Sequence, residues 1–336
     1  MSKIGVIGAG GWGLGLAILL NGNGSKVTVW SKIKEELDGI RRDGENKRSL
    51  PGVPIPKEIQ LSEDLRKVVS ESDVLVFAVA SQYIRKTAKE VGALGIDGLN
   101  IVNVAKGIEE NTLMTMTAVI KDEIPGAGVA VLSGPSHAEE VSRGIPTTCV
   151  IGAHTREYAE YLQNIFMSDV FRVYISPDVI GIELGGSLKN VIALAAGVAD
   201  GLGYGDNTKA ALITRGIHEI TRLGVAMGGK MQTFYGLSGI GDLIVTCASM
   251  HSRNRRAGIL IGQGKTMQEA MDEVNTVVEG VYSAKAALGL AHRYGVELPL
   301  VESVNRVLFE NGSARDEVME LMQRDKKIEN PDLPWD

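Results

Sequence analysis

The first half of the chain alternates short apolar runs with polar turns, a pattern that predicts buried strands joined by helices. Lys3–Ile7 is followed by a glycine-rich turn, by the apolar segment Leu14–Leu20 and by Lys26–Trp30. Unbroken apolar runs are typical of parallel strands, because helices cover both faces of such a sheet. We expect further strands at 73–79, 100–104, 129–132, 147–151 and 171–175, helices at 62–70 (with Ser62 as N-cap) and 156–167, and a long loop at 41–56.

Helical periodicity replaces the strand pattern after Asp178. Apolar residues then recur at the spacing of amphipathic helices. This change predicts a doubly wound, mostly parallel α/β domain over residues 1–178, an all-helical domain over 179–325 and a polar tail over 326–336. After a first helix around Lys189, we expect helices at 207–227 (capped by Asp206 or Asn207), 266–274, 279–294, 299–309 and 314–322.

The turn after the first predicted strand reads Gly8-Ala9-Gly10-Gly11-Trp12-Gly13. A glycine pattern of this kind between a strand and a helix is typical of a Rossmann-type domain that binds the pyrophosphate of a dinucleotide. Gly8 permits the tight turn, Gly10 lets the backbone approach the pyrophosphate, and Gly13 lets the helix pack against the strand. The alternative is a glycine-rich turn without a ligand. In its context between two strands, the motif favours NAD or NADP.

The second predicted strand ends in Trp30-Ser31-Lys32 and carries no acidic residue there. An acidic residue at this point accepts hydrogen bonds from the ribose 2′-hydroxyl and favours NAD. Ser31 and Lys32 instead allow a 2′-phosphate, so NADP is tolerated on this pattern. The alternative is that Lys32 is an ordinary solvent-exposed lysine, and the sequence leaves the choice between NAD and NADP open.

Polar residues follow two other predicted strands at the point where each strand ends. Lys106 comes shortly after 100–104, and Gly134 and Ser136 come directly after 129–132. Ligands of open α/β sheets bind beyond the carboxyl ends of the strands. These residues are therefore candidates for a substrate site, although each also fits an ordinary loop or turn.

One cation, Lys189, lies in the largely apolar helical segment 181–197. Its neighbours at helical spacing are glycine, isoleucine and alanine, and none of them can pair with an ammonium. Burial disfavours the charged form of a lysine, so its pKa should fall toward neutrality, as suits a group that takes and returns a proton. The alternative is a lysine that reaches solvent from a helix whose small residues serve only packing.

Two further candidates lie in the stretch 236–256. Asp242 follows a glycine turn, where it is either an N-cap or the group that orients Lys189 and a substrate hydroxyl. The sequence Ser252-Arg253-Asn254 is either a phosphate site, since Arg binds phosphate in a bidentate manner, or a solvent-exposed basic face. Arg255 and Arg256 are expected on the surface.

Composition excludes several classes of protein. A net charge of −6 argues against a dedicated nucleic-acid binder, and two cysteines without a CxxC motif fit a reducing cytoplasm. The five histidines show no metal-ligand spacing, so no metal site is expected, and His137 and His251 stay open as general bases. The longest apolar run is too short to span a membrane. Ser136 lacks the G-x-S-x-G context of a serine hydrolase.

With these motifs in order, the chain resembles the bacterial type of NAD(P)-dependent glycerol-3-phosphate dehydrogenase over nearly its whole length. The resemblance rests on G-A-G-G-W-G at 8–13, N-K-R-S-L-P-G at 46–52, K-G at 106–107, S-G-P-S-H-A at 133–138, E-L-G-G-S-L-K-N at 183–190, G-D-N-T-K-A-A-L at 205–212, G-L-S-G-I-G-D-L at 236–243, S-R-N-R-R at 252–256 and V-V-E-G at 277–280. Two positions depart from the family, since Gly15 replaces an expected alanine and Ser49 an expected tyrosine.

The resemblance implies hydride transfer between NAD(P)H and dihydroxyacetone phosphate, giving the sn-glycerol 3-phosphate used for phospholipid synthesis. It implies that Lys189 exchanges the proton of the C2 hydroxyl, with Asp242 as its catalytic partner. The implied substrate-binding residues are Lys106, Gly134, Ser136, Lys189, Asn190, Asp242, Ser252, Arg253 and Asn254. The implied cofactor-binding residues are Gly8, Gly10, Gly11, Trp12, Gly13, Lys32, Lys106, Ala138, Arg253, Val277 and Glu279.

Two rival functions stay open on the sequence. One is a 3-hydroxyacid or 6-phosphogluconate type of dehydrogenase, which also joins a dinucleotide-binding domain to a helical domain with a catalytic lysine. The other is a non-catalytic NAD(P)-binding sensor or scaffold, which has no use for Lys189. A homodimer through the helical domain is an allowed assembly, although no apolar stripe specifies it.

Overall fold

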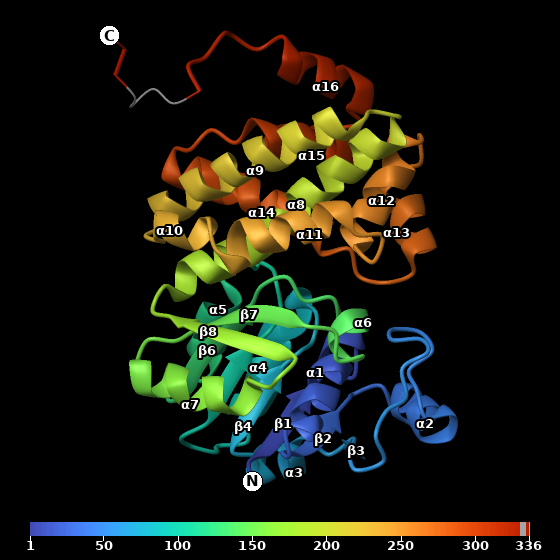
Figure 1. Ribbon diagram of the computed structural model, residues 1–336, viewed down its shortest axis with the longest axis vertical. Helices are drawn as coiled ribbons and strands as arrows, with labels where there is room; N and C mark the ends of the chain where they lie inside the picture. Colours follow the sequence, from blue (N-terminus) through green and yellow to red (C-terminus); the bar gives the residue numbers. More distant parts are fainter. Residues whose placement is uncertain (330–333, 336) are drawn as a thin grey trace.

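The protein folds into a sheet domain and a helical domain stacked along its long axis, in a computed structural model that describes residues 1–329, 334 and 335 (Figure 1). Within these described residues the sheet has eight strands in the order β3-β2-β1-β4-β5-β6-β7-β8, and only β6 and β7 pair antiparallel. The carboxyl ends of β1 to β6 therefore share one edge. The strands are β1 (Lys3–Ile7), β2 (Lys26–Trp30), β3 (Gln60–Ser62), β4 (Val74–Phe77), β5 (Asn100–Asn103), β6 (Gly128–Ser133), β7 (Thr147–Gly152) and β8 (Phe171–Ser176).

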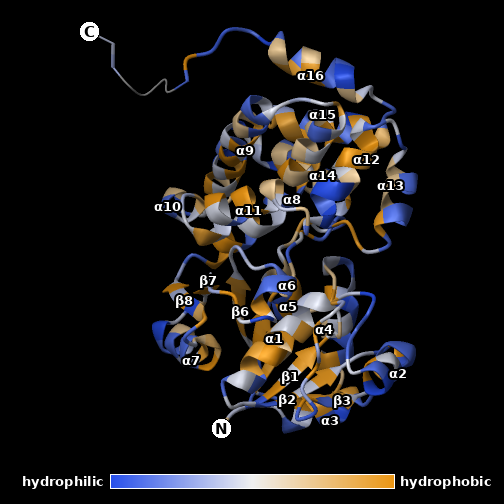
Figure 2. Ribbon diagram, turned by 45° about the vertical axis from the view of Figure 1, so that its right-hand side comes forward, coloured by the Kyte–Doolittle hydropathy of each residue, from blue (hydrophilic) through white to orange (hydrophobic). Residues whose placement is uncertain are grey.

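Helices cover both faces of this sheet, because its strands are apolar on both sides. On one face Ile4 and Val6 belong to the same buried core as Leu16 of α1, and on the other Phe77 packs in a core with Ile84 of α4. In Figure 2 the strands are hydrophobic and α2 and α7 present hydrophilic surfaces. The helices of this domain are α1 (Gly11–Gly22), α2 (Lys34–Asp43), α3 (Leu65–Glu71), α4 (Ile84–Gly92), α5 (Met116–Glu123), α6 (Ala138–Val141) and α7 (Arg156–Phe166).

The helical domain is built around the long helix α8 (Val179–Gly201). Glycines let α12 approach it closely: a Cβ added at Gly258 of α12 would lie 2.1 Å from the carbonyl oxygen of Leu194, and one at Gly197 would lie 2.1 Å from that of Arg255. The other helices are α9 (Asp206–Ala226), α10 (Met231–Phe234), α11 (Asp242–Ala248), α12 (Arg253–Gly262), α13 (Met267–Val274), α14 (Glu279–Tyr294), α15 (Pro299–Phe309) and α16 (Ala314–Met322).

The mostly parallel, doubly wound sheet and the helical second domain confirm the predicted fold class. Two predicted caps were wrong. Asp64, not Ser62, caps α3 by accepting a hydrogen bond from the Lys67 amide, and α9 starts after Gly205 without a side-chain cap. The predicted tail over 326–336 lies partly outside the described residues.

A buried carboxylate from the helical domain ties the two domains together. Glu183 of α8 accepts hydrogen bonds from the amide of Thr117 at 2.8 Å and from its hydroxyl at 2.5 Å. Thr117 lies in the first turn of α5, where amide groups have no partner within the helix. The carboxylate thus caps a helix of the other domain, and burial raises its pKa despite these hydrogen bonds. The edge of the sheet is in this way held against α8.

Candidate active site

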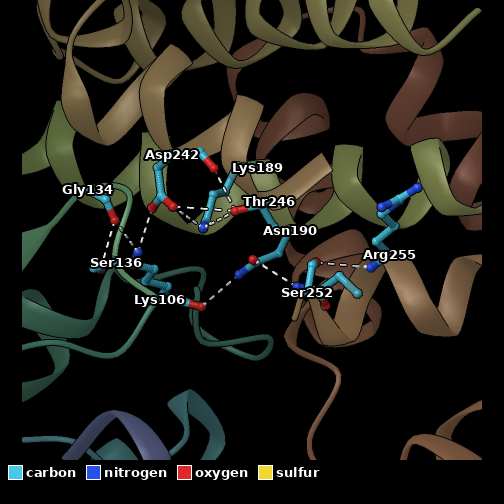
Figure 3. Close-up of polar contacts among 10 residues, drawn as sticks. Lys106, Gly134, Ser136, Lys189, Asn190, Asp242, Thr246, Ser252 and Arg255 are labelled. Atoms are coloured by element: carbon cyan, nitrogen blue, oxygen red, sulfur yellow. Dashed lines mark hydrogen bonds and ion pairs between the residues drawn. The ribbon is translucent and has the colours of Figure 1, made fainter. Parts of the chain in front are cut away.

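Lys189 and Asp242 meet in the interior of the protein, where α8 and α11 cross near the end of β6 (Figure 3). The Lys189 ammonium donates to Asp242 Oδ1 and, at 2.6 Å, to Thr246 Oγ1. The Thr246 hydroxyl in turn donates to the main-chain carbonyl of Asp242, at 2.6 Å. The Lys189 side chain is 7% exposed and that of Asp242 1% exposed, so their pairing is shielded from solvent.

The sequence left two alternatives open for each of Lys189 and Asp242, and the structure shows where both side chains lie. Lys189 does not reach solvent, and its counter-ion comes from another helix, because no carboxylate stands three or four residues from it on its own helix. Asp242 is the first residue of α11, directly after a π-helical turn at Leu237–Gly241, and its carboxylate contacts lysines rather than capping the helix. π-Helical turns often occur at functional sites, because they redirect the side chains that follow.

Lys106 brings the sheet domain to the same carboxylate. Its ammonium donates to Asp242 Oδ2 at 2.5 Å and to the carbonyl of Gly134 at 3.0 Å. The Ser136 hydroxyl donates to that same carbonyl at 2.9 Å. Gly134 has φ of +138°, and a Cβ there would lie 3.1 Å from Cys149 Cα, so this position suits glycine alone. The segments that follow β5 and β6 therefore meet at Asp242.

Burial and charge act in opposite directions on the titration of this cluster. Burial is the largest influence on the Lys189 ammonium, opposed by the Asp242 carboxylate and aided by the Lys106 charge, and together they lower its pKa to about 8. Burial acts to raise the pKa of Asp242, but the two ammonium groups outweigh it and hold that pKa below its usual value. The result is an ionised carboxylate beside an amine whose pKa is close to neutral pH, a combination suited to proton exchange.

A line of amides connects the sheet domain to three helices of the helical domain. Asn190 Nδ2 donates to the carbonyl of Lys106 at 3.3 Å, and Asn254 Nδ2 donates to Asn190 Oδ1 at 2.9 Å. Asn254 Oδ1 accepts from the amide of Gly280 at 2.8 Å. Asn190 and Asn254, both expected to touch substrate, are thus occupied in holding α8, α12 and α14 in register with Lys106.

The start of α12 presents the predicted phosphate-binding residues. The Ser252 hydroxyl caps α12 by accepting from the Arg255 amide at 3.2 Å. Arg253 is exposed, and within the described residues its guanidinium makes no hydrogen bond or ion pair. Arg255, expected on the surface, is instead anchored to Asp200 at 2.8 Å and to the carbonyl of Ala248 at 2.6 Å. Only Arg253 of this pair therefore keeps its donors available for an anion.

The glycine turn fits a dinucleotide. Gly8 has φ of +121°, a Cβ at Gly13 would lie 2.2 Å from the Gly8 carbonyl oxygen, and one at Gly10 would meet no atom within 4 Å. The backbone at Gly10 is therefore open to a ligand. No side chain in the described part of the protein caps α1, so the amides of its first turn are free to bind a ligand. Uncapped amides and the helix dipole together favour a pyrophosphate there.

The loop at 46–52 covers one side of this turn. A Cβ at Gly11 would lie 2.3 Å from the Ser49 carbonyl oxygen and 3.8 Å from Ala138 Cβ, so these three residues are close neighbours. The Trp12 indole NH and the Ser49 hydroxyl are buried here without a hydrogen-bond partner in the described part of the chain. Buried donors of this kind are costly unless a ligand supplies a partner, which favours Trp12 and Ala138 as cofactor neighbours.

Three other predicted cofactor residues are placed less directly. The Lys32 ammonium pairs with Glu90 of α4 at 2.7 Å, on an exposed surface. The Glu279 carboxylate accepts hydrogen bonds from the amide and hydroxyl of Ser81, which follows β4, so it ties α14 to the sheet domain. Val277 is half-buried in the connection that leads into α14.

Sequence reasoning missed Thr246 and Ser81. Thr246 lies four residues after Asp242 on the same helix, so the spacing of the two side chains was a signal that could have found it. Ser81 carries no comparable local signal, because its partner Glu279 is distant in sequence. The two open histidines pack together, with ring centroids 5.8 Å apart, and His137 Nε2 has no partner among the described residues.

Comparisons with known proteins agree with this arrangement. The family models for the N-terminal and C-terminal parts of NAD-dependent glycerol-3-phosphate dehydrogenase match residues 3–159 and 178–319. The glycerol-3-phosphate dehydrogenase [NAD(P)+] of Fusobacterium nucleatum is 62% identical over 98% of this chain and 99% of its own length. The chain belongs to the NAD-dependent glycerol-3-phosphate dehydrogenase family.

Other members of the glycerol-3-phosphate dehydrogenase family are equally complete matches. The enzyme of Agathobacter rectalis is 58% identical over the full length of both chains. The crystal structure of glycerol-3-phosphate dehydrogenase from Coxiella burnetii superposes with a TM-score of 0.93 at 35% identity, covering 96% of this chain and 99% of that one. The resemblance found in the sequence motifs is therefore confirmed at the level of the family and of the fold.

Proposed function

We propose that this protein interconverts dihydroxyacetone phosphate and sn-glycerol 3-phosphate with NAD(P)H, and so supplies the glycerol phosphate backbone of phospholipids. The observation that carries the proposal is the buried Lys189 ammonium, held by Asp242 and Thr246 beside the strand ends of a dinucleotide-binding domain. Family membership supports the same reaction.

We also propose that the domain boundary lies between residues 178 and 179, in the short connection from β8 to α8.

In the proposed reaction the bound dinucleotide supplies the hydride that reduces the C2 carbonyl. The Lys189 ammonium donates a proton to the oxygen that becomes negatively charged, and in the reverse direction the neutral amine accepts that proton. Asp242 and Thr246 hold the amine in place, and Lys106 adds positive charge near the same oxygen. Arg253 and the first amides of α12 bind the substrate phosphate.

The test is oxidation of NADH and of NADPH, measured in parallel, with dihydroxyacetone phosphate as acceptor. We expect turnover that depends on this acceptor, with a product that is sn-glycerol 3-phosphate. A preference for a carboxylate substrate, such as a 3-oxoacid, would instead favour the rival type of dehydrogenase. Binding of dinucleotide without turnover of any acceptor would favour the sensor or scaffold.

We further propose a cytoplasmic enzyme that neither enters membranes nor binds nucleic acid. Helix α8 is long and apolar enough to cross a membrane, but 89% of its most apolar window is buried inside the protein, as in the core helix of a water-soluble domain. The net charge of −6 disfavours contact with phosphate backbones.

A homodimer is the assembly we propose, because exposed Val225, Tyr235 and Met322 line one groove of the helical domain. Sedimentation velocity would contradict this if it showed a monomer.

A further inference from the structure

The end of β2 is not free of acidic groups in the folded protein, although the sequence has none at that point. Ser31, the first residue after β2, donates its hydroxyl to Glu36 Oε2 at 2.8 Å. Glu36 lies in the first turn of α2. The chain turns back between these two residues and places a carboxylate beside the strand end where a dinucleotide-binding domain meets the adenosine ribose.

A second contact fixes this carboxylate in position. Asn46, which is buried, donates from Nδ2 both to Glu36 Oε1 at 3.2 Å and to the carbonyl of Ala9 at 3.1 Å. Ala9 is part of the glycine turn, so one amide connects the carboxylate directly to the predicted pyrophosphate site. Glu36 is therefore held between the two segments that enclose the adenosine half of a dinucleotide.

Lys32, which the sequence allows but does not require to meet a 2′-phosphate, pairs with another group in the structure. Its ammonium pairs with Glu90 of α4 at 2.7 Å. Helix α4 packs in the core on one face of the sheet, through Ile84 and Ala88, whereas α2 packs in the core on the other face, through Leu37 and Ile40. Lys32 therefore contacts a helix on one face of the sheet, whereas Glu36 belongs to a helix on the other face.

We infer that Glu36, positioned by Ser31 and Asn46, is the residue that makes this protein prefer NAD(H) over NADP(H). A carboxylate has about four acceptor positions, and Ser31 and Asn46 occupy two of them. The others can accept hydrogen bonds from the ribose 2′-hydroxyl. A 2′-phosphate, with about two negative charges, would instead be repelled by the carboxylate. The inference rests on the proposed function only in requiring that a dinucleotide binds.

The test measures dissociation constants of NADH and NADPH by fluorescence titration, without dihydroxyacetone phosphate, on the whole protein. We expect the wild type to bind NADH at least about tenfold more tightly than NADPH. The reason is the repulsion, in a half-buried site, between the Glu36 carboxylate and the 2′-phosphate of NADPH. Glu36→Gln should reduce that preference at least about fivefold, mainly by tightening NADPH. Glu35→Gln, the exposed neighbour on the same helix, is the matched control and should leave the preference unchanged.

Lys32→Gln separates the two candidate residues. We expect this substitution to change the NADPH dissociation constant less than about twofold, because it removes only a weak, exposed ion pair with Glu90. Tighter binding of NADPH than of NADH by the wild type, or an unchanged preference in Glu36→Gln, would overturn the inference. Failure of the wild type to bind either coenzyme would overturn it together with the dinucleotide site. Binding with the expected preference but no reduction of dihydroxyacetone phosphate would overturn only the proposed function.

Discussion

At the scale of single residues, Lys189 combines two properties that usually exclude each other. It is buried almost completely, yet it keeps a carboxylate partner in Asp242 and a hydroxyl partner in Thr246. Burial alone would favour the neutral amine, and pairing alone would favour the ammonium. Burial outweighs pairing in this balance and lowers the pKa to about 8, where a small change of pH changes the population of both forms.

This balance predicts opposite pH dependences for the two directions of the reaction. Reduction uses the ammonium, so its rate should fall as pH rises through about 8, whereas oxidation uses the neutral amine and should rise over the same interval. The measurement is kcat against pH in both directions with saturating coenzyme. Asp242→Asn removes the charge that opposes burial, so any inflection that remains should move to lower pH.

Lys189→Ala should reduce kcat by a factor of about 10² to 10⁴ while the protein still binds coenzyme. An unchanged pH profile in that variant would assign the proton transfer to another group.

Arg253 offers a second prediction at this scale. Its guanidinium has no partner in the described residues, so its donors are available to a phosphate in a bidentate geometry that lysine cannot reproduce. Arg253→Lys should raise the KM for dihydroxyacetone phosphate about tenfold, since a hydrogen bond to a charged group contributes about 1.5–3 kcal/mol. Arg256→Lys, an exposed position on the same helix, is the control. Equal KM values for both variants would remove Arg253 from the phosphate site.

At the scale of elements, the contact between α8 and α12 determines where Arg253 lies relative to Lys189. The glycines in this contact leave no room for a methyl group, because the helix backbones are almost in contact. Gly258→Ala should therefore destabilise the protein by about 1–3 kcal/mol or more, through overpacking. Gly39→Ala in α2, where an added Cβ meets no atom within 4 Å, should stabilise it by up to about 1 kcal/mol. Urea denaturation of the two variants checks both signs, and a neutral Gly258→Ala would show that the helices can separate without cost.

Elements with strong periodicity were predictable from the sequence, whereas several short or highly charged helices were missed. The strand Lys3–Ile7 and the helices Glu279–Tyr294 and Pro299–Phe309 have the predicted bounds, because apolar positions and end signals agree there. The missed helices include α2, which is mostly charged, α12, which begins with a run of basic residues, and the short helices α4 and α5. The residues of the site were found through motif and resemblance. Their partners, such as Ser81 for Glu279 or Glu36 for Ser31, depend on how the chain folds back and were not found.

At the scale of the whole molecule, two carboxylates hold the helical domain to the sheet domain, one buried and one half-buried. Glu183 caps α5 and Glu279 binds the backbone at Ser81, so each spans the two domains. Such contacts couple the stability of one domain to that of the other, because separation of the domains breaks hydrogen bonds that both of them share.

Removal of one of these carboxylates should weaken that coupling. Glu183→Ala leaves the amide and hydroxyl of Thr117 without a partner, which should cost about 1–3 kcal/mol and broaden or split the thermal transition. The measurement is differential scanning calorimetry, with the exposed Glu58→Ala as control. A single sharp transition at the wild-type temperature would show that Glu183 does not couple the domains.

The line of amides from Lys106 through Asn190 and Asn254 to Gly280 has a consequence for the history of such proteins. Neither domain alone contains the complete site, because the carbonyl of Lys106 in the sheet domain accepts its hydrogen bond from Asn190 in the helical domain. A chimera that joins this sheet domain to the helices of a distant relative would keep both folds but misalign the lysines, unless matching amides were inherited with them. Recombination between distant genes should therefore seldom give a functional enzyme, and the two halves are expected to have diverged as a single unit.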